Sequence, residues 1–158
     1  MTRRPGGRLR RGFTLIELMV VVIVLGLLAG IGLLKYIDMR NAAIATQMGQ
    51  ELRAVTVASL NFYADKEQWP PEVGAGTVPP GLGPLLPGQL ATSFDRGQYL
   101  MDYDAIGDST SGYVIGVTVT TTDTRLFAKF VQYLGTKAPF SVAGSSLTYL
   151  IAGPGGVF

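Results

Sequence analysis

The sequence predicts an α+β protein in which a long N-terminal α-helix, its first half transmembrane, packs on a head with a small antiparallel β-sheet. Three features of the chain support this fold class. No proline lies between Pro5 and Pro70, and the first part of that stretch is almost purely apolar. A segment dense in proline and glycine follows, which is typical of irregular structure. From residue 99 on, alternating and β-branched residues predominate, as they do in strands.

The apolar run from Phe13 to Leu34 predicts a transmembrane helix. Its roughly twenty-two residues cross about 30 Å of hydrocarbon at ~1.5 Å per residue. Arginines crowd the residues before it, so the positive-inside bias places that end in the cytoplasm and the rest of the chain across the membrane. A plain single-pass anchor fits this pattern. A removed secretory signal fits less well, because the run is long and "LLAG" is a poor cleavage site.

Residues 35–66 are expected to continue the helix as an amphipathic segment packed on the head. Pro70 and Pro71 bar its continuation, so we expect it to end near Lys66. The head itself is expected to span residues 67–158, beginning with an irregular Pro/Gly-rich connection over 67–98. Apolar and small side chains recur at helical spacing at Ile37, Ile44, Met48, Leu52, Val55, Ser59 and Phe62.

Residues 99–158 are expected to form the sheet, with a short helix near 124–134. The segments "QYLMDY", "GYVIGVTVTTT" and "SLTYLIA" read as strands. Apolar residues in "DTRLFAKFVQYLG" instead recur at helical spacing. Asp123 or Thr124 can cap the start of that helix and Gly135 can end it. The alternative for this segment is the second strand of a hairpin.

The composition excludes several classes of function. The chain has no cysteine and no histidine, which rules out disulfides, thiolate zinc sites, cysteine nucleophiles and histidine-based triads. All 11 acids lie after Phe13, whereas five of the 13 bases precede it, so the body is mildly acidic and no direct nucleic-acid binding is expected. No carboxylate pair has a recognisable catalytic spacing, and we do not expect an enzyme.

One acidic segment, "DYDAIGDSTSG", is a candidate calcium site. We expect it to form a glycine-containing loop that carries Asp102, Asp104 and Asp108, and Ca²⁺ takes six to eight oxygen ligands. The spacing does not fit an EF-hand. A solvated acidic turn is the plainer interpretation, and no other cofactor is expected.

The N-terminus carries the most specific pattern of the chain. Gly12, Phe13, Thr14, Leu15, Ile16 and Glu17 follow a basic leader and open the apolar run. This stretch resembles the start of type IV prepilins and type II secretion pseudopilins, the family with a prepilin-type cleavage and methylation signal. The resemblance implies that a prepilin peptidase cuts between Gly12 and Phe13, removing residues 1–12, and that the new Phe13 amine is methylated.

The same resemblance implies a role for Glu17, the one charge inside the apolar run. A carboxylate within a membrane costs roughly 2.5–3.5 kcal/mol on insertion scales. The Phe13 amine of a neighbouring subunit can pair with Glu17, which would set the register of assembly. The alternative is that Glu17 reaches the headgroups at the membrane edge. Many pilins carry a proline late in the run; this chain has Gly26, Gly30 and Gly32 there as weak points instead.

The implied protein is a pilin-like lollipop, a structural subunit of a type IV pilus-like filament. A compact head without a cysteine-closed loop, and "WPP" after the helix, favour a type II secretion pseudopilin. The alternatives are a type IV pilus pilin or minor pilin for adhesion, motility or DNA uptake, and a membrane-tethered binding module that does not polymerise. The expected partners are further pilin or pseudopilin subunits, prepilin peptidase, an inner-membrane platform protein, an assembly ATPase and membrane lipid. The expected location is the bacterial inner membrane, with the head periplasmic, and then the filament.

Overall fold

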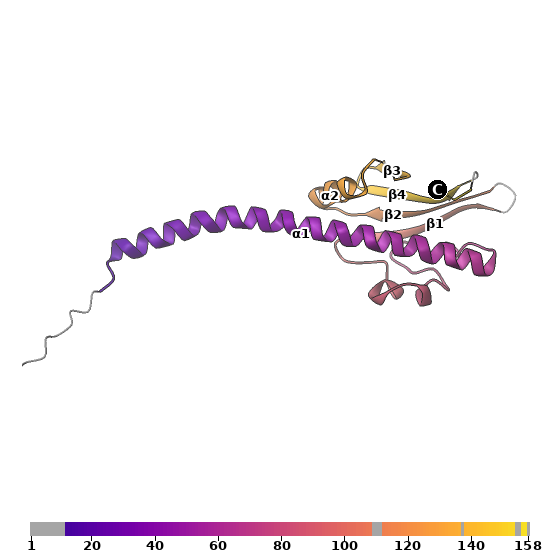
Figure 1. Ribbon diagram of the computed structural model, residues 1–158, viewed down its shortest axis with the longest axis horizontal. Helices are drawn as coiled ribbons and strands as arrows, with labels where there is room; N and C mark the ends of the chain where they lie inside the picture. Colours follow the sequence, from indigo (N-terminus) through magenta and orange to yellow (C-terminus); the bar gives the residue numbers. More distant parts are fainter. Residues whose placement is uncertain (1–11, 109–111, 137, 154–155, 158) are drawn as a thin grey trace, which may run out of the picture. The chain divides into compact units, whose positions relative to one another are not determined.

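The computed structural model describes residues 12–108, 112–136, 138–153 and 156–157 (Figure 1). The chain divides into two compact units, the first ending at Met39 and the second starting at Arg40. Helix α1 (Leu15–Lys66) belongs to both, because its first residues form the first unit and its remaining ones enter the second. The leader expected over residues 1–12 lies outside the described residues except for Gly12.

The first unit is a bare apolar helix. Every residue from Gly12 to Met39 is exposed except Ile37, which is half-buried. The helix is continuous through Gly26, Gly30 and Gly32, where an added Cβ would meet nothing within 4 Å. The glycines therefore neither break α1 nor pack against any other part of the described chain.

In the second unit, α1 buries one stripe against the head. The helix ends at Lys66, followed by Glu67 in the left-handed region at φ 54°. Of the seven stripe positions predicted from the sequence, Ile37, Ile44 and Phe62 are half-buried, and the other four are fully buried. The buried residues of α1 are Asn41, Ala45, Met48, Gly49, Leu52, Val55, Ala58 and Ser59, spaced as one helical face requires.

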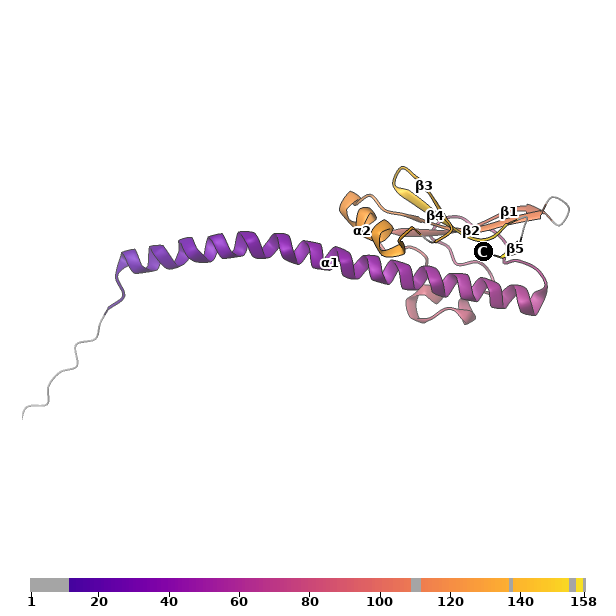
Figure 2. The same ribbon diagram turned by 45° about the horizontal axis from the view of Figure 1, so that its top comes forward.

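The sheet is antiparallel throughout, as predicted. Its strands are β1 (Leu100–Asp108), β2 (Gly112–Thr120), β3 (Phe140–Ala143), β4 (Ser146–Gly153) and β5 (Gly156–Val157). The order is β1-β2-β4-β3, and β5 pairs with the end of β4. Figure 2 shows the sheet on one side of α1, within the second unit.

The short helix predicted near 124–134 is present as α2 (Thr124–Leu134), so the alternative of a strand is wrong. The Asp123 side chain accepts hydrogen bonds from the backbone N–H groups of Arg125 and Leu126, which makes Asp123 the N-cap. Gly135 ends α2 at φ 69°, in the region that favours glycine.

The acidic loop expected around Asp104 and Asp108 is a strand instead, so that prediction was wrong. Strand β1 continues to Asp108, which pairs with Gly112 of β2. Asp and Gly have poor β-propensity, but cross-strand pairing over the whole of β2 outweighs it here. The irregular connection of 67–98 holds two short 3₁₀ turns, η1 (Gly83–Leu85) and η2 (Gly88–Ala91).

The core lies between α1, the inner face of the sheet, α2 and the connection. Alternate residues of β1 and β2 point inward, as a pleated strand requires. The connection contributes its own apolar side chains from the other side of α1, where Figures 1 and 2 place η1 and η2. The fully buried core residues from the sheet and the connection include Met101, Tyr103, Ile115, Val117, Val119, Leu147, Ile151, Leu82, Leu90 and Phe94.

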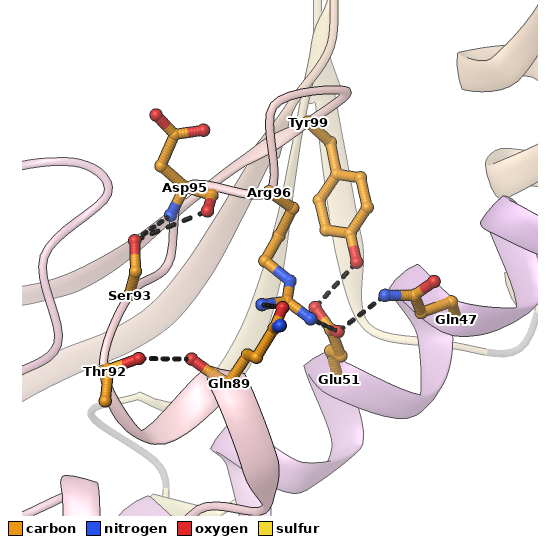
Figure 3. A network of polar contacts seen from close by, with 8 residues as sticks. All are labelled: Gln47, Glu51, Gln89, Thr92, Ser93, Asp95, Arg96 and Tyr99. Atoms are coloured by element: carbon orange, nitrogen blue, oxygen red, sulfur yellow. Dashed lines mark hydrogen bonds and ion pairs between the residues drawn. The ribbon is translucent and has the colours of Figure 1, made fainter.

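A polar network fastens the connection to α1 (Figure 3). The Arg96 guanidinium donates to Glu51 Oε1 at 2.7 Å, and the Tyr99 hydroxyl donates to Glu51 Oε2 at 2.6 Å. Gln47, one turn earlier on α1, donates to Oε1 at 2.9 Å. The Arg96 and Glu51 side chains are only 14% and 12% exposed, so their charges depend on each other. Burial, and next the hydrogen bond to Glu51, raise the pKa of Tyr99, which keeps its hydroxyl protonated as a donor.

The outer face of the sheet carries hydroxyl groups on β2 and β4 and carboxyl groups on β1. Thr118 donates to Asp104 and therefore accepts from Thr148, whose hydroxyl lies at 2.9 Å. Asp102 lies on the same face of β1. Its burial, and then the charges of Asp104 and Glu72, raise the pKa of the Asp102 carboxyl above its usual value.

We expect Glu51→Ala to lower the free energy of unfolding by up to about 3 kcal/mol, because it leaves the Arg96 guanidinium partly buried without its anion. Glu51→Gln, which keeps the shape and one acceptor, should cost less. Denaturant unfolding of the full chain in detergent micelles measures both variants. Equal stability of Glu51→Ala and the wild type would contradict the role of the network.

We expect Asp102→Asn to raise the melting temperature at neutral pH. A carboxyl whose pKa is raised by folding destabilises the fold when ionised, and this penalty is absent below the unfolded pKa of about 3.9. The gain should therefore shrink as the pH falls through the folded pKa and vanish at about pH 3.5. Asp65→Asn is the control, since Asp65 makes only an exposed pair with Lys66 and should change little.

Candidate functional site

The start of α1 is organised by Thr14 and Glu17. Thr14 precedes the first helical residue, Leu15, and its hydroxyl accepts from the Glu17 backbone N–H at 3.4 Å. The same hydroxyl donates to Glu17 Oε2 at 3.5 Å, and the Thr14 carbonyl accepts from the N–H groups of Glu17 and Leu18. Thr14 is thus the N-cap of α1, and Glu17 occupies the third helical position.

This arrangement gives the Glu17 carboxylate a stabilising environment within its own chain. The N-terminal end of a helix carries partial positive charge, and an acidic side chain in the first turn interacts favourably with it. This cap was not predicted from the sequence, where Thr14 figures only in the family resemblance. The signal was present as Thr-x-x-Glu before an apolar run, the pattern of a capping box.

Gly12 and Phe13 lie just before the helix and are fully accessible. The Phe13 side chain is 73% exposed, and nothing lies within 4 Å of a Cβ built on Gly12. An amine created at Phe13 would therefore lie one residue before the N-cap, at the same end of the helix as Glu17. Cleavage after Gly12, methylation of Phe13 and the pairing of Glu17 with the Phe13 amine stay predictions.

The surface of the first unit is the second feature of the site. Helix α1 is the one described helix that is long and apolar enough to cross a membrane, by length and composition. Its most apolar window has a mean hydropathy of 2.7 and buries none of its residues within the chain. Large exposed apolar surfaces mark contact with a membrane or with other protein chains. The range Phe13 to Leu34 therefore needs lipid or protein around it.

The predicted calcium ligands do not converge among the described residues. Asp102 and Asp104 lie on the outer face of β1, and the Asp104 carboxylate already accepts from Thr118. The side chain of Asp108 lies outside the described residues. Within the described part of the chain, no group of three or more acidic side chains is placed to hold a metal ion. Calcium binding stays a prediction.

Comparisons with known proteins point to one family. Residues 7–33 match the family model described as "Prokaryotic N-terminal methylation motif". The chain is similar to the type IV major pilin protein PilA of Myxococcus xanthus, with 36% identity over 59 residues, 37% of this chain and 27% of the relative. It is also similar to the fimbrial protein EcpC of Eikenella corrodens, with 32% identity over 71 residues, 45% of this chain and 46% of the relative. The chain spans less than half the length of these relatives. No solved structure matches the chain significantly.

The matched motif covers the residues that the structure organises into the capped start of α1 and its bare apolar surface. The similar proteins are a type IV pilin and a fimbrial protein. A long apolar helix followed by a small antiparallel sheet agrees with both findings. Residues 7–33 of the chain thus carry a prokaryotic N-terminal methylation motif, and the chain is similar to type IV pilin-like proteins.

Proposed function

We propose that this protein is a structural subunit of a type IV pilus-like filament. The observation that carries the proposal is the first unit: a helix apolar on all sides, with a capped carboxylate at its start, inside a methylation motif. Such a surface can be buried equally well in lipid and in a bundle of identical helices. The subunit therefore has two compatible environments, the membrane before assembly and the filament core after it.

The assembly step follows from the chemistry of the N-terminus. Cleavage after Gly12 leaves a cationic amine at Phe13, next to an exposed Glu17. Lipid and filament core are both apolar, so burial alone gives little preference between them. An amine of one subunit against Glu17 of its neighbour adds an attraction that is strong in low dielectric and depends on the axial offset. The pair would thus favour one register among many.

The remaining partners and the location belong to the same proposal. The subunit waits in the bacterial inner membrane with its N-terminus cytoplasmic and its head periplasmic. Prepilin peptidase processes it, and a platform protein with a cytoplasmic ATPase extracts it. The supporting observations are the arginines before the span and the motif at residues 7–33.

The finer proposal is a type II secretion pseudopilin, and a type IV pilus subunit is the alternative. The chain has no cysteine to close a C-terminal loop. In the "WPP" segment, the Trp69 ring stacks on Tyr63 of α1 with centroids 4.5 Å apart, which fixes the turn out of the helix. The similar proteins favour the alternative, because they are a pilin and a fimbrial protein. Electron microscopy of sheared surface fibres distinguishes the two, since a pseudopilus stays within the cell envelope.

The mature protein is expected to begin at Phe13 and to carry one methyl group on its amine. Intact mass and N-terminal sequencing of protein from membranes or filaments measure this directly. A mature end beyond Gly30 would instead indicate a secretory signal. An uncut N-terminus would indicate a plain anchor.

Glu17→Ala is expected to insert into the membrane normally but to lower filament yield at least about tenfold, because a buried ion pair that loses one partner is strongly destabilised. Glu17→Gln should behave alike, since the amide carries no charge. Glu67→Ala, an exposed position after α1, is the control and should assemble normally. Unchanged assembly of Glu17→Ala would favour a tethered module that does not polymerise.

A further inference from the structure

The second unit has an open groove between α1 and α2. Its volume is about 240 Å³, and Leu52, Arg53, Val57 and Tyr133 are among its lining residues. The Tyr133 ring lies directly against Gly49 of α1, where a Cβ would overlap the ring. Val57, which also lines the groove, is 56% exposed. The groove is thus a largely apolar depression in which the Tyr133 ring rests on Gly49.

Arg53 gives this groove a positive charge. It lies one turn before Val57 on the same face of α1, so the two positions are about 6 Å apart along the helix axis. Arg53 is exposed, and it makes no hydrogen bond or ion pair with another described residue. The groove therefore presents an apolar position and a free cation with a defined spacing.

The hairpin end of β1 presents the complementary pair. Ile106, 64% exposed, is the most exposed large apolar residue described in the second unit. Asp104 lies two residues earlier on the same outer face of β1, about 7 Å away at the rise of a strand. The next residue on that face is Asp102, and the charges of the acids Asp104 and Glu72 act on its carboxyl. The outer face of β1 therefore presents an apolar side chain, Ile106, near the hairpin end and two acidic side chains, Asp104 and Asp102, farther along the strand.

We propose that Ile106 and Asp104 of one copy dock into the α1–α2 groove of a second copy, Ile106 beside Val57 and Tyr133 and Asp104 beside Arg53. The argument rests on opposite charge, on exposed apolar residues at both surfaces, and on spacings that agree within about 1 Å. The inference rests on the proposed function and names a contact between the heads in the filament.

The geometry of the second unit makes this contact self-propagating. Figures 1 and 2 place α2 and the hairpin end of β1 and β2 at opposite ends of the unit, so a chain cannot fill its own groove. A contact between two different surfaces leaves one free hairpin and one free groove on every pair. Such head-to-tail contacts form open helical polymers when the rotation does not close a ring.

The absence of native cysteines allows a direct test by cross-linking. In assembled filaments, Ile106→Cys combined with Val57→Cys should give a ladder of dimers, trimers and higher multimers after oxidation, seen on a non-reducing gel. Each single variant should give no ladder. The matched control is Val57→Cys with Val142→Cys, which is 46% exposed on β3 and should also give none.

The charge pair is tested by reversal in the same cross-linking background. Arg53→Glu should lower the ladder yield about tenfold, because like charges then face each other, and Asp104→Arg in addition should restore it. Arg125→Glu on α2, outside the groove lining, is the control and should leave the yield unchanged. Melting curves of each variant exclude loss through unfolding.

Two outcomes are kept apart by microscopy of the same samples. Filaments that form normally while the Ile106–Val57 pair gives no ladder, or no more than the Val142 control, overturn this contact and leave the proposed function standing. A wild-type chain that forms no filaments overturns the proposed function, and this inference with it.

Discussion

Helix α1 is one continuous element that must suit two surroundings, and the rest of the structure follows from this constraint. Over residues 15–39 the described part of the chain leaves every residue exposed except the half-buried Ile37, whereas beyond Arg40 the helix supplies one wall of the core. Its second part is therefore amphipathic, with small residues such as Ala45 and Ala58 where packing is close. Its first part is not amphipathic, because lipid and neighbouring helices both favour apolar side chains on every side.

The carboxylate at Glu17 has to be tolerated in lipid and, in the proposed filament, among neighbouring helices. In the single chain, the Thr14 hydroxyl and the N-terminal end of the helix stabilise it without a second charge. This lowers the cost of holding the carboxylate in an apolar environment. A local cap does not neutralise the charge, however, so a cation from a neighbour still adds stability. The cap and the proposed intersubunit pair thus act at successive stages.

Short sequence signals predicted the ends of the helices, because those ends are set by interactions between residues close together in the sequence. Two prolines marked the end of α1, and Asp123 with Gly135 marked the limits of α2, because caps and breakers act within a few residues. The length of β1 was missed, since its acidic residues favour a strand only once β2 pairs with them. The link between Glu51 and Arg96 was also missed: it joins residues 45 positions apart and leaves no local pattern. At the N-terminus, the motif identified Glu17, but its Thr14 cap was overlooked.

The network around Glu51 explains how a head without disulfides holds its long connection in place. Fixing the segment between α1 and β1 costs conformational entropy, which a disulfide would lower by constraining the unfolded chain. Here Leu82, Leu90 and Phe94 anchor the segment by burial, and burial alone tolerates sliding because it has no direction. Arg96 and Tyr99 meet the two oxygens of one carboxylate, and that geometry admits a single register. The polar contacts to Glu51 fix the position of the connection, and apolar burial supplies most of its stabilisation. Neither contribution depends on the redox state of the compartment.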